Sequence, residues 1–427
     1  MQPVRARRVL LVGATTVLAV AGTVAVMAPA HAVGATTRIS SNSARVAGDG
    51  PSEAPWVTAD GRYVGFSSSA GNLVTGDTNF SADVYLRDRL AGTIERISVA
   101  SDGTQGQYPS QRPRISADGR YVVFDSFATT LVPGDTNGLT DTFLRDRQTH
   151  TTTRLSLTSA GQQVAGSSWG ASVSSDARYV TFTSDASTLV SGDTNGVNDV
   201  FLRDRQAGTT VRVSTGSGGG QANGDSRDAI LSADGRYLAF ESSATNLVSG
   251  DTNGSVDVFV KDLRTGTVQR VGVTSSGGQF GGGSSAPSMS ADGRYVTFSG
   301  QPSGAFAQIY VRDRQAGTST LVSVGYDGKP ASSATYEATI SGNGRYVAFG
   351  TGAGNILPGT PPYYNTYVRD LTGHTTTLGS VTYTGAAIQE SSLYPTMSNA
   401  GLVFVAFAAY VVPDQGTRSE QVYFHPL

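Results

Sequence analysis

The sequence of 427 residues contains no cysteine. This absence excludes disulfide bonds, thiolate metal sites, a cysteine nucleophile and a lipid-modified N-terminal cysteine. Helix-forming runs of Ala, Leu, Glu and Lys are also missing, and Val, Tyr, Phe and Thr instead form short clusters between turn residues. We therefore expect an all-β protein.

Lysine and histidine are scarce as well. Lys261 and Lys329 are the only lysines, and His150, His374 and His425 are the only histidines after residue 32. When the three arginines in the first eight residues are set aside, 28 basic side chains oppose 33 acidic ones, a formal net charge of −5. This charge argues against nucleic-acid binding, and the dispersed histidines give no pattern for a catalytic triad or a histidine metal site.

The first 32 residues have the parts of a secretory signal peptide. Arginines precede an apolar stretch over residues 9–27, and Ala30 and Ala32 supply the small-x-small pattern that signal peptidase cuts. We predict that residues 1–32 are removed, that no stable membrane span is left, and that the protein is secreted to the extracellular space or the cell envelope. A retained membrane anchor is the alternative, because the apolar stretch is just long enough to span a bilayer.

One phrase of ten residues recurs through the rest of the chain. It is Ile-Ser-Ala-Asp-Gly-Arg-Tyr-Val-Val-Phe at residues 115–124, with close copies at 231–240 and 289–298. Looser copies bring the total to seven, at residues 58–66, 173–182, 340–349 and 397–407. The first five copies are 58 residues apart, as their aspartates show: Asp60, Asp118, Asp176, Asp234 and Asp292. This fixed period predicts a repeat architecture that fills one domain, residues 33–427.

Each repeat is expected to form four short strands. In the second repeat the first strand ends near Ile115, and the others cover residues 121–124, 142–144 and 153–157. The second of these is apolar on both faces, so both faces must be covered. Small four-stranded sheets that cover one another when repeated radially predict a seven-bladed β-propeller.

The two ends of the repeat region complete each other. The fourth-strand arginines Arg96, Arg154, Arg212 and Arg270 keep the 58-residue step, and one step back falls on Arg38, which has no repeat of its own. The last repeat stops after its third strand, residues 421–424. We predict that the N-terminal strand completes the last blade and closes the ring, which removes two free sheet edges.

The repeated phrase, followed by Asp-Val-Phe-Leu-Arg-Asp as at residues 199–204, resembles the WD-like propeller repeats of TolB-type proteins. The resemblance covers essentially the whole chain after the leader, although the usual phrase has proline where this chain has Ala117. It implies a propeller fold and is consistent with a non-catalytic binding scaffold, since related propellers serve as docking platforms or as gates in front of peptidases. We expect a monomer that binds a protein, peptide or glycan ligand.

In the first four repeats the second strand is followed by Gly-Asp-Thr-Asn and then a further aspartate. The side chains concerned are Asp77, Asn79, Asp83, Asp135, Asn137, Asp141, Asp193, Asn195, Asp199, Asp251, Asn253 and Asp257. Their spacing resembles positions one, three and seven of a calcium loop, so calcium is one hypothesis for the role of these oxygens. The alternative is structural: Asx turns formed by Asp77 and Asn79, with Asp83 capping the loop through backbone N–H groups.

The residues six and seven places before each repeat aspartate differ from repeat to repeat. They belong to the innermost strand, so they should surround the mouth of the central channel. We predict a ligand-binding site there, formed by Glu53, Arg112, Trp169, Arg227, Asp228, Tyr336, Glu337 and Tyr394. Aromatic and charged side chains of this kind suit a peptide or a sugar.

The sequence offers no convincing catalytic motif. Residues 166–170 fit the pattern Gly-x-Ser-x-Gly, but a nucleophile elbow requires a helix after the serine, and here a strand is expected. We therefore expect a non-catalytic protein. The alternative is an extracellular propeller hydrolase or lyase that acts on carbohydrate.

Overall fold

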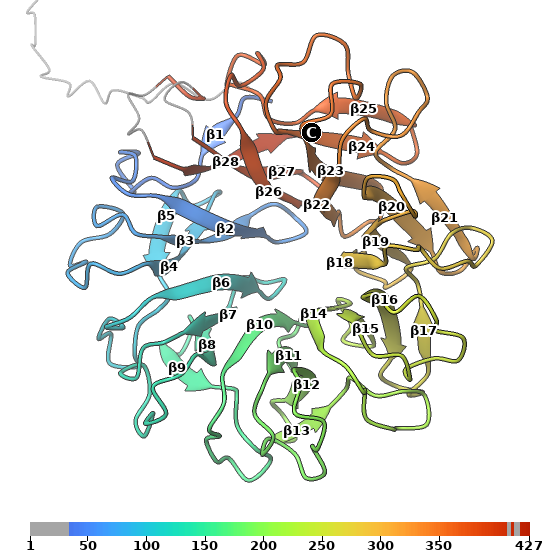
Figure 1. The fold of residues 1–427 in the computed structure, drawn as a ribbon. Coiled ribbons are helices and arrows are strands. Elements are labelled where there is room, and N and C mark those ends of the chain that lie inside the picture. Colours follow the sequence, from blue (N-terminus) through green and yellow to red (C-terminus); the bar gives the residue numbers. More distant parts are fainter. Residues whose placement is uncertain (1–33, 408–410, 414–418) are drawn as a thin grey trace, which may run out of the picture. The chain divides into compact units, whose positions relative to one another are not determined.

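The computed structural model describes residues 34–407, 411–413 and 419–427. The predicted signal peptide lies outside the described residues. Seven four-stranded antiparallel sheets are arranged radially around a central channel (Figure 1), which confirms the predicted seven-bladed β-propeller. Among the residues described, no helix is long and apolar enough to span a membrane.

The blades follow one another in sequence order. The first three blades comprise β2 (Ser52–Val57), β3 (Tyr63–Ser68), β4 (Asp83–Asp88) and β5 (Thr93–Arg96); β6 (Ser110–Ile115), β7 (Tyr121–Ser126), β8 (Asp141–Asp146) and β9 (Thr151–Arg154); and β10 (Ser168–Val173), β11 (Tyr179–Ser184), β12 (Asp199–Asp204) and β13 (Thr209–Arg212). The next three comprise β14 (Ser226–Leu231), β15 (Tyr237–Ser242), β16 (Asp257–Asp262) and β17 (Val268–Arg270); β18 (Ser284–Met289), β19 (Tyr295–Gly300), β20 (Gln308–Asp313) and β21 (Thr318–Leu321); and β22 (Thr335–Ile340), β23 (Tyr346–Thr351), β24 (Asn365–Asp370) and β25 (Thr375–Leu378). The seventh combines β26 (Ser392–Met397), β27 (Gly401–Ala406) and β28 (Gln421–Pro426) with β1 (Thr37–Arg38).

The N-terminal strand closes the ring as predicted. In Figure 1 the blue strand β1 lies beside the red strand β28, and the two are antiparallel, with Arg38 opposite Tyr423. The pairing continues beyond the strand, because the amide of Ile39 donates to the carbonyl of Val422 at 2.8 Å. The Ile39 side chain is buried in a core cluster that joins the first and seventh blades. Closure therefore adds apolar packing as well as hydrogen bonds.

The recurring phrase is explained by the turn that it forms. Ser116 Oγ and the amide of Arg120 both donate to Oδ1 of Asp118, at 2.6 and 2.9 Å. The guanidinium of Arg120 then pairs with Asp146 at the end of the third strand, at 2.6 Å. Equivalent arginine–aspartate pairs join the second and third strands of all six blades from the first to the sixth. The phrase therefore repeats because each blade needs the same turn.

Apolar packing lies mainly between neighbouring blades. Phe124 in β7 stacks on Phe143 in β8 with ring centroids 5.8 Å apart, and both belong to a cluster that includes Val84 and Leu86 of the preceding blade. Gly119 has a left-handed φ of 72°, and a Cβ there would lie 2.3 Å from the ring of Tyr63 in the preceding blade. The glycine is therefore required both by the turn and by the close approach of the two blades.

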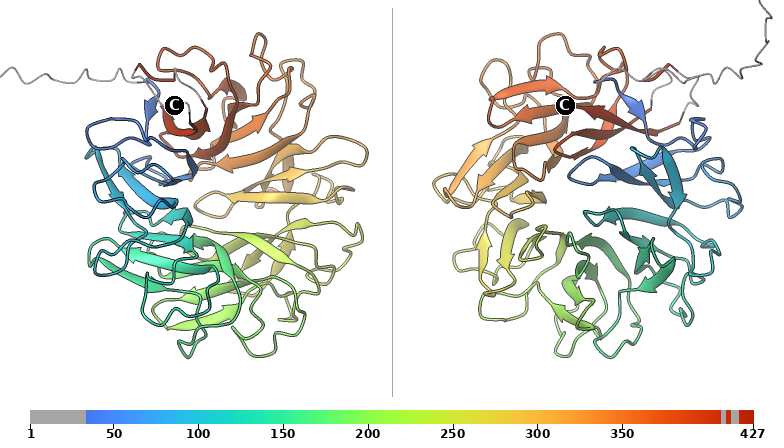
Figure 2. Two further views of the ribbon diagram at one scale, coloured as in Figure 1. Left: turned by 60° about the vertical axis from the view of Figure 1, so that its left-hand side comes forward. Right: turned by 180° about the vertical axis from the view of Figure 1, so that it is seen from behind.

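The two faces of the propeller differ in the length of their loops. One face carries the short turns, such as residues 58–62 and 89–92, and we call it the short-turn face. The other, the long-loop face, carries the loops between second and third strands and the connections between blades, such as residues 69–82 and 97–109. Two further views are given in Figure 2. On the long-loop face the two kinds of loop are bonded together, since Asn79 Nδ2 donates to the carbonyl of Gly106 at 2.8 Å.

Candidate functional site

Each innermost strand has a β-bulge at its start, on the long-loop face. The register of all seven inner pairs is interrupted at this point, for example between Gln111 and Arg114 in β6. The bulge residue has a positive φ in six blades: Ala54, Arg112, Gly170, Asp228, Ala286 and Tyr394. Left-handed backbone is costly for residues other than glycine, and a bulge turns a side chain away from the regular alternation of the strand. The fold therefore holds these residues in an unusual conformation at the rim of the channel.

The bulges surround a cavity of about 420 Å³, which we call the wide cavity. It brings together five of the eight predicted site residues: Arg112, Trp169, Asp228, Glu337 and Tyr394. The other three, Glu53, Arg227 and Tyr336, do not line it. The residues that line the cavity are mostly at the bulge position of their strand. The three residues that do not line it are one position before the bulge. The bulge thus decides which side chains reach the channel.

Arg227 is instead engaged on its own blade. Its Nε donates to Oε1 of the buried Glu241 at 2.7 Å. Tyr336 remains exposed on the long-loop face, beside the cavity and not within it. These two residues and Glu53 therefore lie outside the cavity lining, and their part in ligand binding stays a prediction.

Carboxylates link neighbouring blades around the wide cavity. Oδ2 of Asp125 accepts the amide of Gly170 at 2.9 Å, and Oε2 of Glu241 accepts the amide of Ala286 at 3.0 Å. Oε2 of Glu337 accepts the amide of Tyr394, also at 3.0 Å. Each acceptor lies in one blade and each donor is the bulge residue of the next, so the carboxylates help to hold the bulges in place.

Burial changes the acidity of the carboxyl groups near the cavity. It raises the pKa of Asp125 to about 6 and also raises the pKa of Glu337. The pKa of Asp228 is raised by burial and by the nearby Glu241 carboxylate. Carboxyl groups with raised pKa values in a cavity are often found at functional sites.

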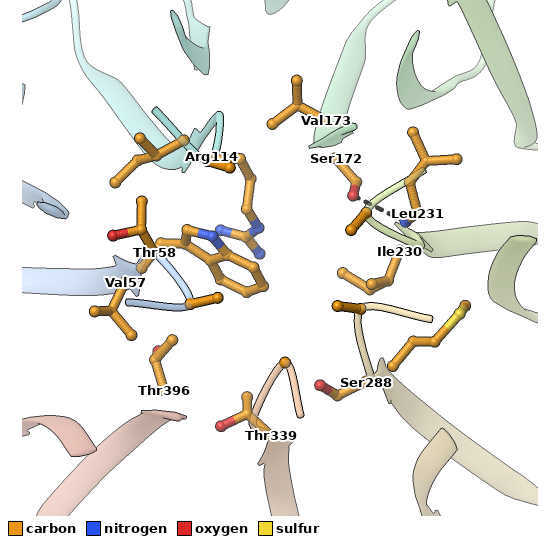
Figure 3. Close-up of a pocket in the computed structure, with 18 of the residues that line it drawn as sticks. Val57, Thr58, Arg114, Ser172, Val173, Ile230, Leu231, Ser288, Thr339 and Thr396 are labelled. Carbon is orange, nitrogen blue, oxygen red and sulfur yellow. Dashed lines mark hydrogen bonds between the residues drawn. The ribbon is translucent and has the colours of Figure 1, made fainter. Parts of the chain in front are cut away.

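Deeper in the channel lies a second, narrower cavity of about 140 Å³. Arg114 and Trp56 line both cavities, and the Arg114 guanidinium lies 4.2 Å from the centroid of the Trp56 ring. Figure 3 shows Arg114 reaching toward the channel centre, among Ser172, Ser288 and Thr339 of other blades. Ser172 is itself engaged, because its Oγ accepts the amide of Leu231 at 3.0 Å. Neither Arg114 nor Trp56 was singled out by the sequence pattern.

The Gly-Asp-Thr-Asn loops are held by an arginine. In the first blade Arg96 lies 3.1 Å from Asp77 and 3.4 Å from Asp83. Oδ1 of Asn79 accepts the amide of Ser81, so the expected Asx turn is present at this asparagine. Asp83 accepts from the side chains of Asn79 and Ser98, and not from backbone N–H groups as expected.

The same arrangement recurs in the next three blades, where Arg154, Arg212 and Arg270 each contact two loop aspartates. Burial raises the pKa of Asp83 and raises that of Asp257 to about 6. Within the described part of the chain, no group of three or more His, Cys, Asp or Glu side chains is arranged to hold a metal ion. The geometry favours the structural interpretation, and calcium binding stays the alternative hypothesis for these loops.

Exposed aromatic side chains gather on one face. Five lie in loops between second and third strands, three in connections between blades, and two at the starts of inner strands: Phe80, Phe127, Phe306, Tyr363, Phe407, Tyr108, Tyr326, Tyr383, Tyr336 and Tyr394. All ten therefore belong to the long-loop face. The short-turn face presents the arginine–aspartate pairs and the exposed Leu90.

No protein-family model and no curated protein matches the sequence. Solved structures share the fold at low identity. An oligogalacturonate lyase in complex with manganese has a TM-score of 0.58 at 12% identity, over 92% of this chain and 93% of that one. Acylaminoacyl peptidase from Pyrococcus horikoshii has a TM-score of 0.54 at 12% identity, over 88% of this chain, which spans only 51% of the peptidase.

TolB from Acinetobacter baumannii also matches, with a TM-score of 0.43 and 18% identity over 77% of this chain. The match spans 64% of the TolB chain, less than two thirds of its length. The reported structures with a TM-score above 0.5 are proteins named as a lyase and a peptidase. At these identities the comparisons show a shared propeller fold.

Proposed function

We propose that this protein is a non-catalytic binding scaffold that receives a protein or peptide ligand on its long-loop face. The observation that carries the proposal is the gathering of all ten exposed aromatic side chains among the described residues on that face. Aromatic side chains are enriched at the centres of protein interfaces. The surface of a soluble monomeric protein seldom carries many exposed aromatic side chains on one face unless that face binds a partner. The wide cavity opens on the same face, so one ligand can contact both.

The chemistry of the cavity supports binding. Trp169 and Tyr394 offer apolar surface, while Arg112, Asp228 and Glu337 offer charges of both signs. Such a mixture fixes the orientation of a ligand inside an otherwise apolar cavity. The bulged backbone holds these residues in place before a ligand arrives, which lowers the entropic cost of binding.

Selection of a displayed random-peptide library on the purified protein tests the proposal. Peptides selected on the parent should lose about tenfold or more in affinity for the variant Tyr326→Ala/Tyr336→Ala, since each change removes an exposed aromatic contact. The matched control is Leu90→Ala, which removes an exposed apolar side chain from the short-turn face. Equal affinity for all three proteins would refute binding on the long-loop face.

A second candidate function is a hydrolase or lyase that acts on carbohydrate. It is favoured by Asp228 and Glu337, two cavity carboxyl groups whose pKa values are raised by burial. A protein named oligogalacturonate lyase also shares the fold. Incubation with a panel of neutral and acidic polysaccharides, followed by reducing-end and ultraviolet assays, separates the two functions. Turnover that is lost in Asp228→Asn or Glu337→Gln would establish an enzyme, and a scaffold shows none.

We also propose that the protein acts outside the cytoplasm, a proposal supported by the signal-peptide pattern predicted over residues 1–32. The expected mature N-terminus is Val33. Mass spectrometry of the protein recovered from the culture medium or the cell envelope tests this. A chain that retains residues 1–32 would support the membrane-anchor alternative.

A further inference from the structure

Arg114 is not a residue that the blade requires. The equivalent positions on the other six inner strands are occupied by a tryptophan and by small or apolar residues: Trp56, Ser172, Ile230, Ser288, Thr339 and Thr396. All of them line the channel at the same level. Six blades therefore form without a charge at this position, so the repeat itself gives no reason for the arginine in β6.

The protein provides few hydrogen-bond acceptors and no ion pair for the positive charge of Arg114 in the part of the chain that the structure describes. Its Nη1 donates to the carbonyl of Pro113 at 3.0 Å, while its buried Nε–H has no hydrogen-bond partner. No carboxylate in the described part of the chain lies within ion-pair distance of it. A guanidinium has five N–H donors, so several remain available. Burial lowers the pKa of Arg114 to about 10, which reflects the cost of a charge in this place.

Arg145 shows how a guanidinium in this fold can bond to two blades, although its Nε–H, like that of Arg114, has no hydrogen-bond partner. Nη1 of Arg145 donates to the carbonyls of Ala100 and His150 and to Oγ1 of Thr152. Arg145 thereby joins two blades. Arg114 makes no comparable set of hydrogen bonds to two blades. Its contact with the Trp56 ring is a cation–π interaction between the charged guanidinium and the ring.

The charges of Asp125 and Asp228 act on Arg114 through space and partly offset the lowering of its pKa by burial. Asp125 is occupied by the amide of Gly170 and by the hydroxyl of Thr142, at 2.9 and 3.3 Å. Asp228 lies at the rim of the wide cavity. Neither forms an ion pair with Arg114, so an anion that enters the channel need not displace an internal partner.

The wide cavity gives access to this charge from the long-loop face. Arg112 and Arg114 both line it, and the bulge at Arg112 turns that side chain toward the same space. A guanidinium presents parallel N–H groups that match the two oxygens of a carboxylate. Two guanidinium groups and the Trp56 ring therefore line one cavity that an anionic group could enter.

We propose that the channel binds the carboxylate group of a ligand, which Arg114 recognises from the bottom of the wide cavity and Arg112 from its rim. The inference deepens the proposed function, on which it rests, by naming the chemical group that enters the cavity. A peptide C-terminus and an acidic sugar both carry this group, and the experiment distinguishes them.

The chain provides its own reporters, because its only two tryptophans, Trp56 and Trp169, both line the wide cavity. Tryptophan fluorescence of the full mature chain is titrated with four probes: N-acetyl-Ala-Ala, its C-terminal amide, D-glucuronate and D-glucose. The proteins compared are the parent, Arg114→Gln, Arg114→Lys and Lys329→Met. The last is the matched control, since Lys329 is an exposed cation on the long-loop face.

We expect a carboxylate probe to change the fluorescence of the parent and of Lys329→Met, with no response to its neutral counterpart. Arg114→Gln should bind it about 10- to 100-fold more weakly, the value of a charge-assisted hydrogen bond, and Arg114→Lys should be intermediate. A response to N-acetyl-Ala-Ala alone identifies a peptide terminus and agrees with the proposed function. A response to D-glucuronate alone identifies an acidic sugar, which supports the role of Arg114 and contradicts the proposed peptide or protein ligand.

Three results would overturn the inference: no response to either carboxylate, equal binding of the neutral probes, or unchanged affinity in Arg114→Gln. If the variants do not fold, the NMR signal of the Arg114 Nε–H in the parent is measured instead. This signal must shift when the carboxylate probe is added and must not shift when the amide probe is added. Peptide selection on Tyr326→Ala/Tyr336→Ala tests the proposed function separately. If those peptides bind the parent while carboxylates do not, only the assignment of Arg114 fails.

Discussion

Nη1 of Arg96 lies 3.1 Å from Oδ1 of Asp77 and 3.4 Å from Oδ2 of Asp83, so one guanidinium faces two buried carboxylates. The chain shows what happens when this pair is lost. In the fifth and sixth blades the carboxylate is replaced by the amides of Gln308 and Asn365, and the arginine is replaced by Leu321 and Leu378. In these two blades both charges are absent, whereas the seventh blade keeps the arginine, Arg38, although Gln421 replaces the carboxylate.

Replacing the arginine alone should therefore destabilise the propeller. We expect Arg96→Leu to lower the free energy of unfolding by about 3 kcal/mol, because it leaves two buried carboxylates without a counter-charge. The double variant Asp83→Asn/Arg96→Leu places the sixth blade's Asn and Leu at these two positions and should recover part of the loss, since Tyr85 still donates to Asp77 at 2.6 Å. Urea unfolding measures both. A double variant as unstable as the single one would show that the two charges are not coupled.

The same geometry predicts the response to calcium. The guanidinium occupies the space between the carboxylates, where a cation would otherwise be needed. We expect the melting temperature of the parent to be the same with a calcium chelator and with added calcium. A specific ion would stabilise the folded state according to its affinity and concentration. A melting temperature that falls with chelator and is restored by calcium would instead support the calcium hypothesis for these loops.

Ring closure makes a prediction about the N-terminal segment. Deletion of residues 35–41 should lower the melting temperature strongly, because it exposes the edge of β28 and opens the core between the first and seventh blades. The milder change Ile39→Ser should cost about 3 kcal/mol, since it removes a buried apolar side chain. Val46→Ser is the control, because Val46 is 54% exposed in the same segment. Parental stability of the deletion variant would mean that the ring does not need β1.

The sequence was sufficient to predict the propeller architecture because each repeat can be recognised from a short run of consecutive residues. The turn at Asp118 and Gly119 is formed within a few residues, so its signature is contiguous and can be counted seven times. The pairing of β1 with β28 was also predictable, since an orphan arginine at Arg38 keeps the step of the other fourth strands. Both inferences depend only on spacing along the chain.

The site was predicted only in part, because side-chain direction depends on the bulge. A regular strand would place neighbouring residues on opposite faces, and no sequence signal marks where the alternation is broken. The pattern therefore could not separate Arg112, which lines the cavity, from Tyr336, which does not. Arg114 was missed for a related reason: its significance appears only when the equivalent positions of all blades are compared at one level of the channel. Such a comparison needs the register of every inner strand.

Asp125 gives a pH dependence whose sign follows from its burial. Its pKa is raised from 3.8 to about 6, so the folded state holds this proton to higher pH than the unfolded state does. The resulting stability is complete below the unfolded pKa and is lost as the pH rises through the folded one. Asp125→Asn cannot titrate. We therefore expect the free energy of unfolding of the parent to fall by about 2 kcal/mol relative to Asp125→Asn between about pH 4 and pH 7.

Urea unfolding of both proteins across this range measures the difference. Asp146→Asn is a control of opposite sign below this range: the hydrogen bond from Arg120 lowers the pKa of Asp146, so its contribution is constant from pH 4 to pH 7 and is lost only as the pH falls below about 4. Parallel curves for the parent and Asp125→Asn would show that Asp125 has an ordinary pKa in the folded protein. The amide of Gly170 would then have a fully charged acceptor throughout this range, and the bulge beside Trp169 would be equally well held at acidic and neutral pH.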